Sequence, residues 1–283
     1  MPFIEALFEY NFLQKALLTS VVVGLICGVI GCFIILRGLA LMGDAISHAV
    51  LPGVALSYML KINYFIGAVI TGIITAIAIG FVSQNSRIKN DTSIGIMFTA
   101  AFAFGIIMIT MMNSSTDLYH ILFGNVLAVR STDMWLTIGI GIAVILLVTL
   151  FYKELLVTSF DETMAKAYGL PVKWIHYFLM TLLTLVTVAS LQTVGIILVV
   201  AMLITPAATA YLLVDRLPTM IFLASTFGVL SAIIGLYFSF TYNLASGATI
   251  VVVATVMFLI AFIFSPKHGL LWKKLKMVKK ASS

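Results

Sequence analysis

Long apolar stretches separated by short polar connections run along almost the whole chain. Each is about 20 residues long, which is the length an α-helix needs to cross the hydrocarbon core of a bilayer. The pattern predicts nine membrane-spanning helices, near residues 13–36, 40–60, 62–82, 92–112, 134–152, 174–191, 193–214, 218–240 and 246–265. Because the second contains Pro52 and Gly53, we expect it to be shorter than a full span or broken at Gly53.

Composition supports the same fold class. Of the 283 residues, 62% are hydrophobic and 9% are charged, whereas a soluble domain carries about a quarter charged residues. We therefore expect an all-α, polytopic membrane helix bundle of eight or nine spans that uses residues 1–283 as a single membrane domain. Cys27 and Cys32 both lie in the first apolar stretch, and we expect them to be buried and reduced.

The distribution of basic residues predicts the orientation, because cytoplasmic connections of membrane proteins are enriched in Lys and Arg. With a cytoplasmic C-terminus, only Lys15, Lys61 and Arg130 of the 16 basic residues lie outside. The basic tail, residues 266–283, then lies next to anionic inner-leaflet lipid. The net charge of +6 therefore requires no nucleic acid.

Two connections are longer than the others. The outer one, residues 113–134, has an apolar centre too short to span, which is typical of a re-entrant or interfacial helix. The inner one, residues 153–174, contains "TSFDETMAKAYGLPV". Asp161 and Glu162 predict the start of a short amphipathic helix, and Gly169 before Pro171 predicts its end with a left-handed C-cap. This helix either covers the end of the bundle or binds a cytoplasmic partner.

Asp44 and His48 are the side chains least expected in an apolar helix. Asp44 is the only acidic residue inside a predicted span, and His48 is the only histidine well inside one. Residues at i and i+4 lie on one helix face about 6 Å apart, and ionisable groups inside membranes mark functional sites by default. Two structural interpretations compete: an intrahelical hydrogen bond, or an N-cap role for Asp44 that leaves His48 unexplained.

The functional interpretation of this pair is a metal site. A carboxylate oxygen with an imidazole nitrogen suits Mn²⁺, Zn²⁺ or Fe²⁺. Two ligands are too few to replace the water shell of a divalent ion, whereas two copies of the chain would supply four around a shared axis. The pattern therefore predicts a homodimer with the metal site on its axis.

The remaining motifs limit the functions that are open. No phosphate-binding G-x-x-x-x-G-K-[ST] loop occurs, so ATP-driven work requires another polypeptide. H-E-x-x-H, G-x-S-x-G and a second intramembrane acid are also absent, which disfavours an intramembrane enzyme. Pro206 should kink the helix near 193–214, either as a gating hinge or, as we favour, as a packing kink.

Four stretches resemble the permease subunit of Gram-positive manganese/zinc ABC importers: "GCFIILRGLALMGDAISHAVLPGVAL" (31–56), "STDLYHILFGNVLAV" (115–129), "TSFDETMAKAYGLPV" (158–172) and "VGIILVVAMLITPAATAYLL" (194–213). The similarity covers essentially the whole chain. It implies a type II ABC importer-like fold, a multi-pass protein of the bacterial plasma membrane, and a homodimer with two cytoplasmic ATP-binding subunits. It also implies metal delivery by an extracellular lipoprotein.

The resemblance further assigns roles to residues. It implies that Asp44 and His48 contact the transported metal, and that the segment with Phe160, Asp161, Glu162 and Gly169 couples the permease to the ATPase. The metal would be cargo and not a permanent cofactor. Mn²⁺ as cargo rests on the resemblance alone, because an N/O site binds Zn²⁺ more tightly than Mn²⁺. The alternative is a secondary transporter or channel that uses Asp44 and His48 as an ion or proton site and needs no ATPase.

Overall fold

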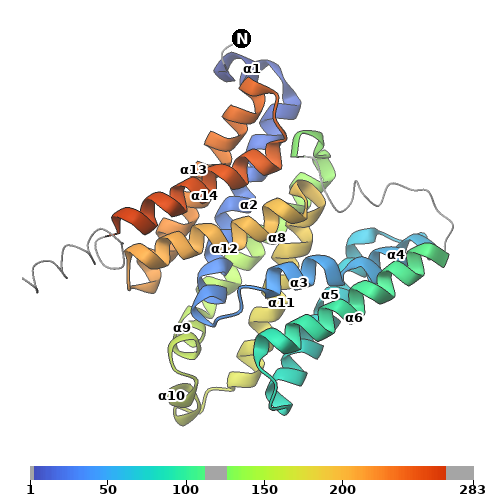
Figure 1. The fold of residues 1–283 in the computed structure, drawn as a ribbon, viewed down its shortest axis with the longest axis vertical. Coiled ribbons are helices and arrows are strands. Elements are labelled where there is room, and N and C mark those ends of the chain that lie inside the picture. The colour runs from blue at the N-terminus through green and yellow to red at the C-terminus, as the bar shows by residue number, and fades with distance from the viewer. Residues whose placement is uncertain (1–2, 112–125, 266–283) are drawn as a thin grey trace, which may run out of the picture.

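The structure, a computed structural model, describes residues 3–111 and 126–265 (Figure 1). Its regular elements are all helical within those ranges. They are α1 (Phe3–Glu9), α2 (Asn11–Leu36), α3 (Met42–Ala49), α4 (Leu51–Met59), α5 (Tyr64–Asn85), α6 (Asn90–Met111), a 3₁₀ turn at Val126–Ala128, α8 (Ser131–Leu150), α9 (Tyr152–Phe160), α10 (Glu162–Ala167), α11 (Val172–Val194), α12 (Ile196–Leu213), α13 (Leu217–Tyr242) and α14 (Ser246–Phe264).

Eight of these helices are long and apolar enough to cross a membrane, which confirms the all-α polytopic fold. They are α2, α5, α6, α8 and α11 to α14. The remaining predicted span, the second in chain order (residues 40–60), is not one long helix but is formed by α3 and α4 end to end. Most of the outer connection 113–134, and all of the basic tail 266–283, lie outside the described residues.

The break in the second predicted span falls at Val50 and not at Gly53. Pro52 lies in the first turn of α4, where its missing N–H costs least, and it cannot donate to the carbonyl of His48 four residues earlier. Gly53 serves another purpose, because a Cβ there would collide with the carbonyl of Gly67 on α5. Gly53 therefore permits close contact between α4 and α5, while Pro52 accounts for the break.

The best-packed part of the bundle surrounds α2, which contacts α8, α11, α12 and α13. Gly24 and Gly28 on α2 let the backbone of α13 approach closely: a Cβ on Gly24 would lie 2.7 Å from the carbonyl carbon of Gly228. Small residues one turn apart allow such close helix contact in membranes, where van der Waals packing holds helices together. The buried side chains Phe33, Ile26 and Ile30 of α2 complete this core.

Different helices form the two ends of the molecule. The short helix α1 lies at one end, and α9 and α10 lie at the opposite end (Figure 1). This arrangement places the segment 160–169 far from the N-terminal helix, with α3 between the two ends (Figure 1). Candidate functional residues therefore occupy two separate places: the middle of the bundle and one of its ends.

Candidate functional site

Asp44 and His48 lie one turn apart on α3, with their side chains facing each other. The distance from Asp44 Oδ1 to His48 Nε2 is 3.5 Å. Two ligand atoms at about 2.1 Å from one cation in a tetrahedral arrangement lie about 3.4 Å apart. The observed spacing thus suits two ligands of a shared cation.

Aromatic rings from α6 hold the His48 imidazole in place. The ring of Phe102 meets it edge-on, with centroids 5.3 Å apart and an interplanar angle of 81°, and Phe98 lies 6.0 Å away. His48 Nδ1 is buried and has no hydrogen-bond partner among the described residues. The neighbouring Ser47 hydroxyl donates to the carbonyl of Gly43 on its own helix. The imidazole is therefore fixed by packing, with its Nε2 edge turned towards Asp44.

The pair is open on one side. The Asp44 side chain is 46% exposed and that of His48 is 30% exposed. Within residues 3–111 and 126–265, no third His, Cys, Asp or Glu joins them in a potential metal cluster. One chain thus presents two ligands and an unfilled side, and divalent metal ions in proteins bind four or more ligands.

The short helix at the end of the bundle has the local structure that its sequence predicts. The Asp161 carboxylate caps α10 by accepting from the amides of Thr163 (2.8 Å) and Met164 (2.9 Å). At the other end Gly169 has φ +77°, its amide donates to Lys166, and the amide of Leu170 donates to Ala165. These two bonds form a Schellman motif, which requires the left-handed conformation that glycine adopts most readily.

Apolar side chains are exposed on this segment. Phe160, Met164 and Tyr168 are 58%, 51% and 71% exposed, respectively, while Glu162 is exposed and Ala165 is buried. A rigid short helix with an exposed apolar surface is typical of a docking element. Its role in coupling is a prediction that the fold does not test.

The two sets of predicted residues are not brought together. The helix α3 packs against α5, α6, α11 and α12, whereas α10 packs against α9 and α11. Pro206 lies buried inside α12, near the point where a Cβ on Gly31 of α2 would collide with the carbonyl of Leu203. This close contact is consistent with the packing interpretation of Pro206, and a hinge there stays a prediction.

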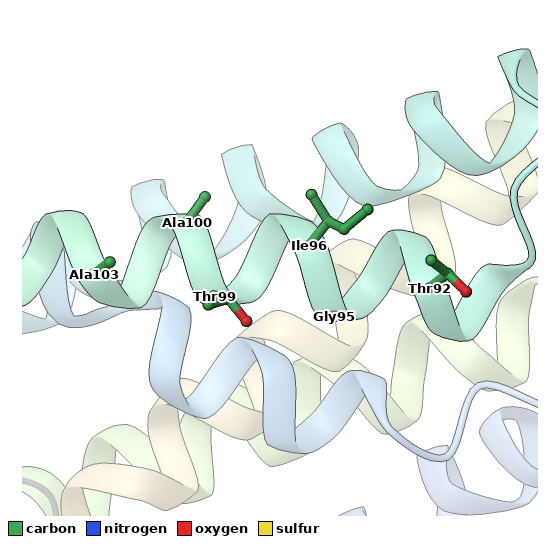
Figure 2. A pocket seen from close by; sticks show the side chains of 6 residues that line it. All are labelled: Thr92, Gly95, Ile96, Thr99, Ala100 and Ala103. Carbon is green, nitrogen blue, oxygen red and sulfur yellow. The ribbon is translucent and has the colours of Figure 1, made fainter.

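A shallow groove follows the outer face of α6 (Figure 2). It is lined by Thr92, Gly95, Ile96, Thr99, Ala100 and Ala103. Most of these side chains are small, and all come from one helix, which leaves this face uncovered (Figure 2). The groove does not include Asp44 or His48 and holds no titratable group.

Sequence reasoning missed one group of polar residues. Arg37, directly after α2, donates hydrogen bonds to Thr158 and Ser159 at the end of α9. From the sequence alone, Arg37 contributed only to the predicted orientation of the chain, as one of 16 basic residues. Its position directly after an apolar run was the available signal, but no sequence pattern connects residue 37 with residues 158 and 159.

Eight apolar spanning helices, together with a half-exposed carboxylate–imidazole pair, define a multi-pass membrane protein with a candidate cation site. The chain belongs to the ABC 3 transport family, whose sequence model matches residues 9–265. It is therefore a membrane transport permease.

Its relatives are similar over nearly their full length. The chain is 71% identical to the "Manganese transport system membrane protein MntC" of Listeria monocytogenes over 98% of this chain and 99% of that protein. It is 54% identical to the "Manganese import system permease protein ScaB" of Streptococcus gordonii over 97% of this chain and 99% of that protein. Among solved structures, "PsaBC from Streptococcus pneumoniae in complex with Fab" matches with a TM-score of 0.86 and 56% identity, covering 97% of this chain and 98% of that one.

Proposed function

We propose that this chain is the membrane-spanning permease of an ATP-driven importer that moves Mn²⁺ into the cytoplasm. The observation that carries the proposal is the Asp44–His48 pair, an oxygen and a nitrogen ligand 3.5 Å apart in an otherwise apolar span. Relatives that are named for manganese transport support Mn²⁺ as the cargo. Zn²⁺ and Fe²⁺ suit the same ligands.

Energy for transport comes from a separate polypeptide in this proposal, because the chain has no phosphate-binding loop. We assign the docking of two ATP-binding subunits to the exposed segment Phe160, Asp161, Glu162 and Gly169, which faces the cytoplasm together with the C-terminus. An extracellular metal-binding lipoprotein delivers the ion to the opposite side. Labelling of a Met164→Cys variant by an impermeant thiol reagent tests this orientation, since only access from the cytoplasmic side agrees with it.

Two copies of the chain complete the metal site. Asp44 and His48 supply two ligands, and their exposed side, 46% and 30% of the two side chains, is where a second pair would approach. A symmetric pair supplies two carboxylates and two imidazoles to one ion. Titration of the purified protein with Mn²⁺ should therefore saturate at one ion per two chains. Saturation at one ion per chain would contradict the shared site.

Transport itself is tested with the purified permease, its ATP-binding subunit and its delivery lipoprotein in proteoliposomes. We expect Mn²⁺ uptake that requires ATP and stops when ATP is replaced by a non-hydrolysable analogue. Liposomes with the permease alone serve as the control. Uptake that proceeds without ATP and follows an imposed proton gradient would instead establish the secondary transporter or channel.

A further inference from the structure

Arg37 occupies the turn that connects α2 to α3, the helix that carries Asp44. The turn has a defined geometry: Gly38 has φ +65°, the amide of Leu39 donates to Ile34, and that of Gly38 donates to Ile35. Met42, the first residue of α3, follows soon after. Arg37 is therefore joined to α3 by a short, hydrogen-bonded turn.

The guanidinium of Arg37 is bound by α9 and not by its own helix. Its Nε donates to Ser159 Oγ (3.1 Å), and one terminal nitrogen donates to Thr158 Oγ1 (2.6 Å). Both hydroxyls use their own hydrogens on α9, since Thr158 donates to the Glu154 carbonyl and Ser159 to that of Leu155. Their oxygens are therefore oriented to accept from Arg37, and the link has a fixed direction and length.

This contact has a desolvation cost. The second terminal nitrogen of Arg37 is buried without a hydrogen-bond partner among the described residues. Burial lowers the pKa of the guanidinium, and the charge of Glu162 on α10 opposes that effect. A basic residue that served only the orientation of the chain would extend into water, as the exposed Arg87 does. Arg37 is instead held between α2, α9 and the start of α10.

The residues that Arg37 binds directly precede the proposed docking element. Ser159 is followed by Phe160 and by Asp161, whose carboxylate caps α10. Only Phe160 and Asp161 separate Ser159 from Glu162, the first residue of α10, so no loop intervenes between the Arg37 contact and α10. No other described side-chain hydrogen bond joins the α9–α10 segment to α2 or to the α2–α3 turn.

We propose that Arg37 is a positioning residue that transmits movement of the α9–α10 segment to the α2–α3 turn and thereby to Asp44 and His48. The proposal rests on the proposed function, in which an ATP-binding subunit docks on α10. Arg37 does not touch the metal. Its loss should separate ATP hydrolysis from transport while the metal site stays intact.

The test uses proteoliposomes that contain the permease, its ATP-binding subunit and the delivery lipoprotein. For Arg37→Gln we expect the maximal rate of Mn²⁺ uptake to fall about tenfold, as for loss of a charged group with two hydrogen bonds. The Mn²⁺ concentration at half-maximal uptake should stay within about twofold, and ATP hydrolysis should continue. Arg37→Lys should be intermediate, because an ammonium group lacks the planar fork that reaches both hydroxyls.

A second variant tests the same link from the other side. Thr158→Val with Ser159→Ala removes both acceptors and leaves Arg37 in place, and it should show the same uncoupling. Adding Arg37→Gln to that pair should cause little further loss, because the substitutions break one interaction. Arg87→Gln is the matched control, since Arg87 is an exposed arginine in the connection between α5 and α6.

Two results would overturn the proposal. One is normal uptake by Arg37→Gln or by the Thr158→Val, Ser159→Ala variant. The other is loss of the ATP-binding subunit from purified Arg37→Gln, which would make Arg37 part of folding or docking. Failure of the proposed function is distinguishable, because the unmodified protein itself would then show no ATP-dependent uptake.

Discussion

The two short helices α3 and α10 carry the residues proposed to act in transport, and they are stabilised in opposite ways. Most of α3 is buried, and it packs against α5, α6, α11 and α12 without a side-chain N-cap. In contrast, α10 buries only Ala165 and is held by the Asp161 cap and the Gly169 turn. An eight-residue or six-residue helix is not stable alone in water. One of these helices therefore depends on its surroundings and the other mainly on its ends.

This difference shows where each helix can be altered without loss of the fold. Asp44 and His48 occupy the open side of α3, so their polar atoms can change while the packed side remains. On α10, the capping residues determine the shape, and the exposed Met164 and Tyr168 can contact a partner. Substitutions on α3 should consequently change metal binding, and substitutions on α10 should change the coupling to the ATP-binding subunit.

Asp44→Asn should have the largest effect on transport. The amide has nearly the same shape as the carboxylate but lacks the charge that offsets a divalent cation, so Mn²⁺ uptake should fall by about tenfold or more. Expression and thermal stability should be unchanged, because Asp44 is 46% exposed. Uptake is measured at equal amounts of protein in the membrane. Full uptake by Asp44→Asn would show that Asp44 is not a metal ligand.

His48→Ala should follow closely, with uptake again reduced about tenfold, because the nitrogen ligand is lost. Isothermal titration with Mn²⁺ should show the weaker binding directly. Ser47→Ala is the control on the same helix: its hydroxyl bonds only the Gly43 carbonyl, so uptake should be retained. Equal losses for His48→Ala and Ser47→Ala would indicate a packing defect in α3 and not a lost ligand.

Gly169→Val should have an intermediate effect. The space around Gly169 is open, so the cost comes from the left-handed φ of +77°. That strain is about 1–2 kcal/mol for a residue with a side chain, equivalent to a factor of about 5 to 30 in an equilibrium constant. Because only part of that cost should reach the transport rate, we expect uptake to fall about three- to tenfold. Binding of Mn²⁺ should be unaffected. Gly169→Asn is the matched control, since asparagine tolerates this conformation better. Full transport by Gly169→Val would mean that the segment only covers the end of the bundle.

Asp161→Ala should have the smallest effect. Loss of the N-cap should lower the free energy of opening of α10 by about 1 kcal/mol. Hydrogen exchange at the amides of Thr163 and Met164, which donate to Asp161, measures that change. Amides of α3 are the internal control, since α3 has no such cap. Unchanged exchange in α10 would show that packing on α9 and α11 holds this helix, as packing holds α3.

Much of the candidate site could be predicted from the sequence because its signals are local. Asp44 and His48 stand out since a charged or imidazole group inside an apolar span is costly. The ends of α10 could be predicted because Asp161 and Gly169 have strong preferences for capping positions. The break in the span 40–60 was wrongly assigned to Gly53, because both proline and glycine interrupt helices and only the contact with Gly67 reveals the role of Gly53.

The membrane-spanning segments and the capping residues follow from the amino-acid sequence, since they depend on hydrophobic length and on interactions between near neighbours. Hydropathy alone did not distinguish α2 from α6, although most of the apolar stretch of α2 is buried in the protein and most of that of α6 is not. An apolar side chain suits lipid as well as protein, so burial depends on which helices meet. Three features depend on how the helices pack in space: which helices α2 and α6 meet, the opening beside Asp44 and His48, and the link from Arg37 to Thr158 and Ser159. Each joins residues that are distant in the chain or depends on the residues around it, so local sequence patterns do not reveal it.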